Sequence, residues 1–200
     1  MKDFFESLKY SKRRTTLSTA ASERQIYLHR KGWFYVDVFF DRLIVANHPI
    51  DFRGRLELDS PTISVTDLLL EKLQIVSFSE KDLKDTFLLF IAHDLRSGDE
   101  SESINVDRVA KLLSEDWGFW YTVTTNLKGI KTLLATLTDI SVEERSNIVS
   151  KIDSLQARID AESKTTGWKL RSAIGPRKRW YRQVETAETV GEFGIWRLKE

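Results

Sequence analysis

The sequence DVFFD, residues 37–41, places two carboxylates in one of the most strand-like runs of the chain. Asp37 and Asp41 are four residues apart, so on a strand both point to the same face as Phe39. A carboxylate in a run that must be buried is a candidate metal ligand. The alternative is a strand whose charged ends reach water. Asp37 begins the run between two valines, whereas Asp41 lies at its end, so Asp37 is the stronger candidate.

The second candidate is Lys72, in SVTDLLLEKLQIV, residues 64–76. At ~100° per residue the leucines, Ile75 and Val76 fill one arc of a helix, and Lys72 falls inside that arc. An amphipathic helix has no packing reason to point an ammonium at its core. Lys72 therefore either runs along the edge and places its amine in water, or it faces a cleft and meets an anion such as a phosphate.

The next helix candidate, SEKDLKDTFLLFIAH, residues 79–93, carries a pair of acids. Asp82 and Asp85 are three residues apart and share one face of a helix. Asp82 also suits the third position of a capping box with Ser79, which is a structural role that competes with a functional one. Asp85 has no such alternative and precedes two leucines by one turn.

Residues 168–182 form a basic and aromatic candidate. Three aromatic residues are interleaved there with six basic side chains and no acid: Lys169, Arg171, Arg177, Lys178, Arg179 and Arg182. Arginine beside aromatic rings is typical of proteins that hold single-stranded nucleic acid, so RNA is a candidate partner. The interpretation that we favour is that Trp168 and Trp180 attach the tail to the helices while the charges are solvated.

The composition excludes several classes of site. The formal net charge of +1 gives no global attraction to nucleic acid or acidic membranes. The absence of cysteine excludes disulfides, thiolate zinc sites and cysteine nucleophiles, and the three histidines have no metal-ligand spacing. The start of the chain lacks the apolar core of a signal peptide, and no apolar run approaches the ~20 residues needed to span a bilayer. We therefore expect a cytoplasmic protein with no membrane span.

The elements that must position these candidates change character along the chain. Residues 3–9 suggest a short helix, 11–24 a polar connection, and 25–40 a hairpin around a glycine-containing turn. Two further strand candidates are RLIVAN, residues 42–47, and RLELD, residues 55–59, and SGDESES, residues 97–103, is expected to be a loop. Helices are predicted over 64–76, 79–93, 104–116, 117–137 and 141–162.

This order predicts an α+β fold, with a small mixed or antiparallel sheet followed by an α-helical C-terminal region. We expect a β-rich part over residues 1–62, a helical region over 63–165, and a basic aromatic tail over 166–200 packed on the helices. The last long helix carries an apolar seam at steps of four, three and four, typical of packing along another helix: Ile148, Ile152, Leu155 and Ile159. The aromatic run EDWGFWY, residues 115–121, is expected to fill the core.

Several of these motifs resemble the nucleotidyltransferase-like proteins of the DNA polymerase β superfamily. VDVFFDRL, RLELD, DLLLEKL and KDLKD occur in the same order and at similar spacing, and EDWGFWYTVTTNL and GWKLRSAIGPRKRWY resemble closing segments. The nearer relatives in this resemblance are bacterial predicted nucleotidyltransferases, and the toxin of AbiE-type systems is more distant. The resemblance covers roughly residues 1–130.

The resemblance implies roles for individual residues. Asp37, Lys72, Asp82 and Asp85 match positions of the catalytic set, with Asp67 in the same motif as Lys72. Lys72 and Lys81 are implied to contact the nucleotide, and Asp37 is implied to bind a metal. The cofactor implied in the same way is Mg²⁺, and the ligand is a nucleoside triphosphate.

One departure from the family pattern limits the expected activity. No Gly-Ser turn followed by a paired-acid strand precedes Asp37 in this sequence. Nucleotidyl transfer uses two magnesium ions held by carboxylates around an in-line displacement, and a lone Asp37 cannot hold two ions. We therefore expect binding of a nucleotide or phosphate, with transfer in doubt. The alternative is a non-catalytic interaction module, or an RNA-binding module, whose sheet is completed by a partner chain or a second copy.

Overall fold

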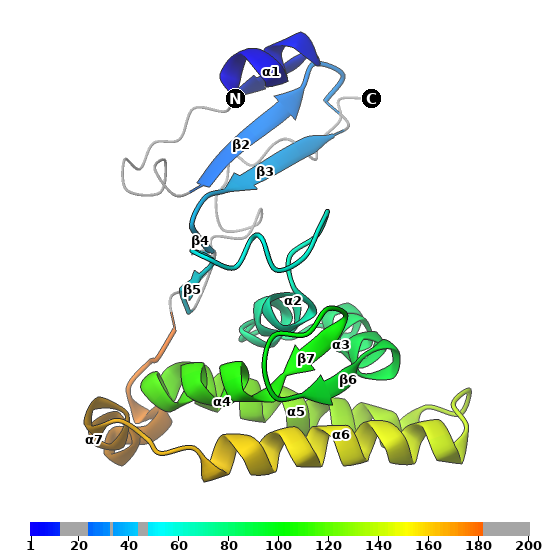
Figure 1. Cartoon of the computed structure of the whole chain (residues 1–200), viewed down its shortest axis with the longest axis vertical. Helices are drawn as coiled ribbons and strands as arrows, with labels where there is room; N and C mark the ends of the chain where they lie inside the picture. Colours follow the sequence, from blue (N-terminus) through cyan, green and yellow to red (C-terminus); the bar gives the residue numbers. More distant parts are fainter. Residues whose placement is uncertain (13–23, 33, 44–47, 182–200) are drawn as a thin grey trace.

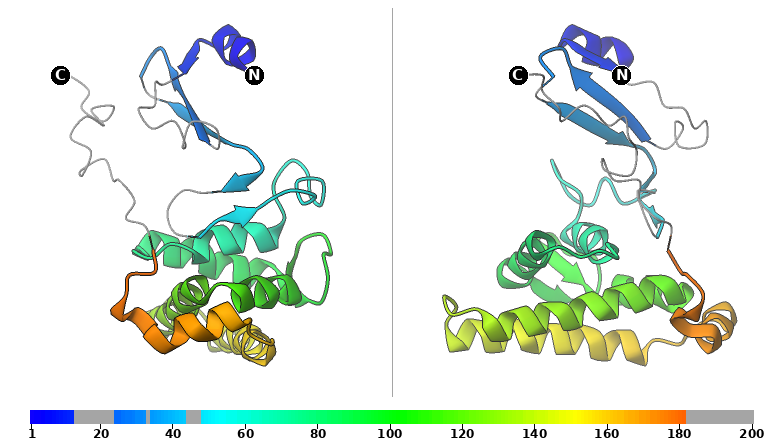
Figure 2. Two further views of the ribbon diagram at one scale, coloured as in Figure 1. Left: turned by 90° about the vertical axis from the view of Figure 1, so that its left-hand side faces the viewer. Right: turned by 180° about the vertical axis from the view of Figure 1, so that it is seen from behind.

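The computed structural model describes residues 1–12, 24–32, 34–43 and 48–181. A small sheet with one short helix lies at one end of the molecule, and a body built from helices α2 to α7 lies at the other (Figure 1; Figure 2). The predicted α+β class, with the sheet first and the helices after it, is confirmed. Among the described helices, none combines the length and apolarity that a membrane span requires.

The small sheet consists of the antiparallel strands β1 (Tyr10–Lys12), β2 (Arg24–His29) and β3 (Tyr35–Phe39), in the order β1-β2-β3. The short helix α1 (Lys2–Ser7) precedes it in the chain. The predicted hairpin is confirmed as β2 and β3, which pair with Tyr27 opposite Val36. Phe5 of α1 stacks on Tyr27 with ring centroids 4.0 Å apart, and Tyr27 is buried. Strand β1 was not predicted, because its sequence is polar and only three residues long. The predicted polar connection lies mostly at 13–23, outside the described residues.

A second strand pair, β4 (Arg42–Leu43) with β5 (Ile50–Asp51), links the sheet to the helices. Residues 44–47 of the predicted strand RLIVAN lie outside the described residues. The predicted strand at 55–59 is wrong, because the backbone turns there. Gly54 has φ +69°, Arg55 N donates to Phe52 O at 2.9 Å, and Leu58 N donates to Arg55 O at 3.2 Å.

Helices α2 to α6 of the body follow the predicted segments closely, whereas α7 was not predicted, because its residues were assigned to the basic aromatic tail. The body comprises α2 (Val65–Leu73), α3 (Glu80–Ala92), α4 (Val106–Glu115), α5 (Trp117–Thr136), α6 (Val142–Ala161), α7 (Thr166–Ile174) and the 3₁₀ turn η1 (Gly175–Arg177). The predicted N-caps Ser64, Ser79 and Ser141 each accept a hydrogen bond from the backbone N–H three residues later. In Figure 1, α6 lies along one side of the body, beside α4 and α5, and α2 and α3 lie nearer the sheet.

A short parallel pair was missed by the sequence analysis: β6 (Asp94–Arg96) and β7 (Ser103–Asn105). The loop predicted over 97–103 joins these strands, although its last residue, Ser103, belongs to β7. Thr66 of α2 attaches β7 to the body, because its hydroxyl donates to Ser103 O at 3.3 Å and accepts from Asn105 N at 2.8 Å. Strands of three residues are too short to show the alternation that reveals longer ones.

The core lies between α2, α3, α4, α5 and α6. All four residues of the predicted seam of α6 are at most 1% exposed. Trp117 and Phe119 are also buried, so the aromatic run at the start of α5 contributes to the core as expected. Lys151 of α6 caps the C-terminal end of α3. Its Nζ donates to Phe90 O at 3.0 Å and to His93 O at 2.8 Å.

Candidate functional site

Helix α2 is fixed at both ends, which determines where Lys72 points. At its start, Ser64 Oγ accepts from Asp67 N at 3.2 Å. At its end, Asn126 Nδ2 of α5 donates to Leu73 O at 2.9 Å and to Ile75 O at 2.8 Å. Because three leucines of α2 are also fully buried, the helix cannot rotate without losing core contacts. The direction of Lys72 is therefore set by the packing of its own helix.

Lys72 crosses from α2 to α3 and meets acids there. Its Nζ donates to Asp85 Oδ2 at 2.9 Å and lies 3.7 Å from Asp82 Oδ1. The Lys72 side chain is 25% exposed. The amine is thus held between two helices at the edge of the core, where it remains accessible to a small anion. Three of the predicted site residues, Lys72, Asp82 and Asp85, are brought together by the fold.

Lys81 joins the same group. Its Nζ donates to Asp85 Oδ2 at 2.7 Å, so two ammonium groups converge on one carboxylate oxygen. The hydrogen bonds from Lys81 and then Lys72 lower the pKa of Asp85 to about 2. A carboxylate with that pKa is ionised at neutral pH and is a poor proton acceptor. Asp85 can hold two lysines in place, but it is not suited to act as a general base.

Asp82 has the structural role that the sequence suggested, together with a contact to Lys72. Its Oδ2 accepts from Ser79 N at 3.2 Å and from Ser79 Oγ at 2.6 Å, which completes the capping box of α3. Its Oδ1 is the oxygen that faces Lys72. The α2–α3 site, as we call Lys72, Lys81, Asp82 and Asp85 together, is therefore formally neutral.

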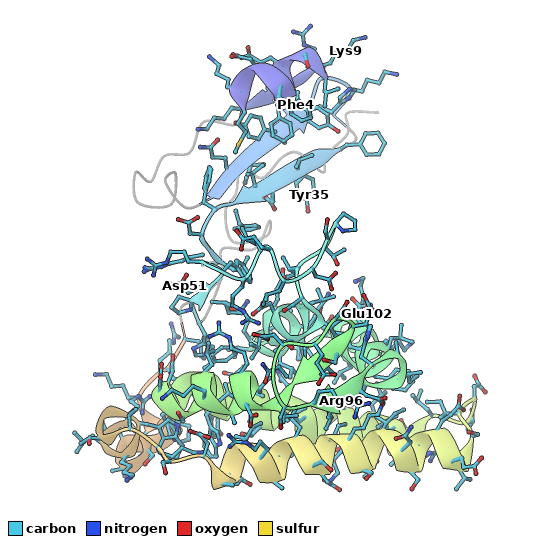
Figure 3. The ribbon with its side chains drawn as sticks, in the orientation of Figure 1. Phe4, Lys9, Tyr35, Asp51, Arg96 and Glu102 are labelled. Carbon is cyan, nitrogen blue, oxygen red and sulfur yellow. The ribbon has the colours of Figure 1, made fainter. Side chains whose placement is uncertain are left out.

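Asp37 is not part of this group. It lies on β3 opposite Ile26, and β3 belongs to the small sheet, with β4, β5 and the 52–63 segment between it and α2 (Figure 1; Figure 2). Figure 3 labels Tyr35 on the same strand, well apart from Arg96 on β6 of the helical body. Asp41, the weaker candidate, is exposed just after the end of β3. The spatial grouping of Asp37 with Lys72 that the resemblance implies is not found in this arrangement.

An ion-pair network missed by the sequence analysis anchors the start of α2. Asp67 is 1% exposed, and its Oδ2 accepts from Arg55 Nε at 2.7 Å and from Ser64 Oγ at 2.7 Å. Arg55 also donates to both oxygens of Asp99, at 3.2 Å each. Burial of Arg55 opposes its charge, but the hydrogen bonds to Asp99 and Asp67 outweigh this effect and raise its pKa. Sequence reasoning gave no signal for this network, because Arg55 pairs with acids 12 and 44 residues further along the chain.

Much of the described part of the tail is used for packing. The Trp168 ring meets Trp120 at 5.1 Å and 72°. The Arg171 guanidinium lies 4.5 Å from the Trp117 ring centroid and donates to the carbonyl oxygens of Gly175 and Lys178. The basic side chains left exposed on α7 and η1 and just after them, within the described residues, are Lys169, Arg177, Lys178 and Arg179. We call these four side chains the basic surface; Arg182 lies outside the described residues.

The described residues do not offer a ligand set for magnesium. Within them, no group of three or more His, Asp or Glu side chains is placed to hold a metal ion. Asp37 contributes one carboxylate, and the carboxylates of the α2–α3 site are occupied by lysines. Mg²⁺ therefore stays a prediction of the resemblance, and no chemical step is derived through it.

Comparisons with protein-family models, with curated proteins and with solved structures find no match to this chain. We therefore infer its function from the geometry of its own residues.

Proposed function

We propose that this chain is a nucleotidyltransferase-like protein that binds the phosphate groups of a nucleotide at the α2–α3 site and does not carry out transfer with its own residues alone. The observation that supports this proposal is the convergence of the Lys72 and Lys81 amines on one oxygen of Asp85, at 2.9 and 2.7 Å. A phosphate oxygen is bound in the same way, by several ammonium donors at hydrogen-bond distance.

The geometry leaves donors for such a ligand. Each ammonium group has three N–H donors. Lys81 uses one of its three donors in the hydrogen bond to Asp85. Because its side chain is 78% exposed, it can turn toward an incoming phosphate without losing packing contacts. Lys72 is held in place by α2 and supplies a fixed point of attachment. Asp85 thus holds the two amines close together before a phosphate binds.

The charges of the site predict modest affinity. Two lysines and two acids sum to zero, so the phosphate must compete with Asp85 for the amines. Water screens charge interactions at a partly exposed site, so each of them is weak. Removing the acid charge should therefore strengthen phosphate binding.

Calorimetric titration with each nucleoside triphosphate, with and without Mg²⁺, tests the proposal. We expect saturable heat for the wild-type chain, loss of that heat in Lys72→Met, and tighter binding in Asp85→Asn. Lys84→Met is the matched control, because Lys84 is an exposed lysine of α3 whose ammonium pairs with Glu80 instead. No heat with any nucleotide, or equal loss in Lys72→Met and Lys84→Met, would remove the site.

The basic surface favours a second candidate function, the binding of single-stranded RNA. The observation that supports it is that its four cations are exposed and that no acid occurs between Lys164 and Tyr181. Because Trp168 and Trp180 are engaged with α5, the expected contact is with phosphates rather than by base stacking. Four phosphate contacts predict that log K falls against log salt with a slope of about −3.

Filter binding of oligouridylate over a range of salt concentrations tests the RNA candidate. Replacing the four cations of the basic surface by Gln should flatten the slope. The control replaces four exposed lysines elsewhere, Lys2, Lys9, Lys84 and Lys128, so that the net charge changes equally. Equal weakening in both variants would mean that only net charge matters, and binding to anionic vesicles without binding to RNA would point to a different partner.

The alternative to nucleotide binding is that a partner chain or a second copy of this chain completes the small sheet. An unpaired strand edge readily adds another strand. Light scattering at high protein concentration measures this directly, and a strictly monomeric chain would count against the second copy.

The cytoplasm is the compartment we propose, because a chain without cysteine suits a reducing environment.

A further inference from the structure

Arg108 is a half-buried arginine without an acidic partner. It lies in the first turn of α4, and its Nη2 donates to the backbone oxygen of Asp51 at 3.3 Å. In the part of the chain that the structure describes, no carboxylate forms an ion pair with this guanidinium, and its buried Nε has no hydrogen-bond acceptor. An arginine has five N–H donors, and this structure accounts for one of those that Arg108 carries.

The surroundings of Arg108 disfavour its positive charge. Burial, followed by the nearby charge of Arg55, lowers the pKa of Arg108. The opposing effect of three acids is smaller: Asp67, Asp99 and Asp51. The first turn of a helix is also an unfavourable place for a cation, because the helix dipole is positive there. Since an arginine keeps its proton in proteins, the fold holds a charge that its own acids compensate incompletely.

The nearby acids are engaged by other arginines. Two of the three accept hydrogen bonds from Arg55. The third, Asp51, accepts from Arg53 Nε at 2.9 and 3.0 Å, and these hydrogen bonds hold the pKa of the Asp51 carboxyl well below its usual range. Arg108 therefore meets the neutral backbone oxygen of Asp51 and not its carboxylate.

Two exposed arginines lie beside the same aspartate. Arg42 of β4 is opposite Asp51 of β5, with its Nε 3.6 Å from Asp51 Oδ2. The side chains of Arg42 and Arg53 are 46% and 60% exposed. We call Arg42, Arg53 and Arg108 the arginine cluster. Figure 3 labels Asp51 between the small sheet and the helical body, so the cluster lies where these two parts are connected.

We propose that the arginine cluster binds a phosphate group, with Arg108 as the fixed donor and Arg42 and Arg53 as exposed donors that turn toward the ligand. A guanidinium presents paired N–H donors that match two oxygens of a phosphate. A phosphate has more acceptor oxygens than a carboxylate, so three guanidinium groups can share it. Its negative charge compensates the charge of Arg108. This site is separate from the α2–α3 site and does not depend on the function proposed there.

The proposal predicts opposite effects of Arg108 on stability with and without the ligand. A half-buried charge without an ionic partner destabilises the folded chain. Arg108→Met keeps an unbranched side chain and removes that charge, so without phosphate the variant should be at least as stable as the wild type. A ligand that binds the folded chain stabilises it in proportion to the logarithm of the ligand concentration above the dissociation constant. Phosphate should therefore stabilise the wild type and not Arg108→Met.

Urea unfolding of the full chain in increasing inorganic phosphate, at neutral pH and with the ionic strength held constant by sodium chloride, tests the proposal. We expect the wild-type midpoint to rise with phosphate and the midpoint of Arg108→Met to stay unchanged. Arg96→Met is the matched control, because Arg96 is a 55% exposed arginine of β6 outside the cluster; it should keep the full rise. Acetate at the same concentrations should give no comparable rise.

Lys72→Met distinguishes this site from the α2–α3 site, and it should also keep the rise. An unchanged wild-type midpoint would overturn the inference, whereas nucleotide calorimetry tests the α2–α3 site separately. A rise that survives in Arg108→Met, that is lost in Lys72→Met, or that acetate reproduces would overturn it as well. If Arg108→Met fails to fold, the double variant Arg42→Gln with Arg53→Gln provides the test: it should need more phosphate for the same rise, and an unchanged phosphate dependence would overturn the proposal.

Discussion

Replacing Asp67 by Ala tests how the start of α2, and with it Lys72, is held in place. Asp67 is 1% exposed and Arg55 is 11% exposed. The substitution therefore removes a carboxylate partner from a guanidinium that water can hardly reach. Breaking a buried pair by removing one member costs ~3–5 kcal/mol. Because Asp99 remains bonded to Arg55, we expect the lower end, a loss of about 3 kcal/mol in the free energy of unfolding.

Urea denaturation followed by circular dichroism measures this loss. With a slope of about 2 kcal/mol per molar urea, the midpoint should fall by about 1.5 M. The matched control is Asp99→Ala, which removes the other carboxylate from the same arginine at a site that is 34% exposed; it should cost less than about 1 kcal/mol. Equal losses in the two variants would refute the argument that burial of the Arg55–Asp67 pair makes it the anchor.

Two further predictions concern the α2–α3 site and the end of α2. Asp85 has a pKa lowered to about 2 by Lys81 and Lys72, so its stabilising contribution is fully present above the unfolded carboxyl range near pH 4 and is lost as the pH falls toward 2. The stability difference between wild type and Asp85→Asn, measured in urea at each pH, should therefore disappear toward pH 2; a constant difference would contradict the ion pairing. Asn126→Ala removes the hydrogen bonds to the carbonyls of Leu73, at the end of α2, and of Ile75, just after it. It should destabilise by about 2 kcal/mol in thermal or urea unfolding, whereas the exposed Asn147→Ala should change little.

Local signals allowed much of the helical body to be predicted. The capping boxes at Ser79 and Ser141 depend on side chains three residues apart, so they can be read without knowing the fold. The seam of α6 was predictable because apolar spacing reports directly which face of a helix is buried. The anomalous position of Lys72 on its helix also identified a residue with a specific partner on another element.

Features that depend on distant contacts were not predictable in the same way. RLELD alternates like a strand, but the turn after Gly54 and the pairing of Arg55 with Asp99, which is far along the chain, give it a different conformation. Strand β7 is held by Thr66 on another element, and β6 pairs with it, so neither three-residue strand leaves a pattern of its own. Asp37 was grouped with Lys72 by the resemblance, whereas the separation of the sheet from the helical body follows from connections that periodicity does not describe.

Phosphate binding at the α2–α3 site can be observed by titrating ATP into the protein while the side-chain Cε–Hε resonances of its lysines are followed by NMR. We expect saturable shifts of Lys72 and Lys81 with one common affinity, and no comparable shift of Lys84 on the exposed side of α3. Shifts that spread evenly over all surface lysines, or an unmoved Lys72 at saturating ATP, would contradict it.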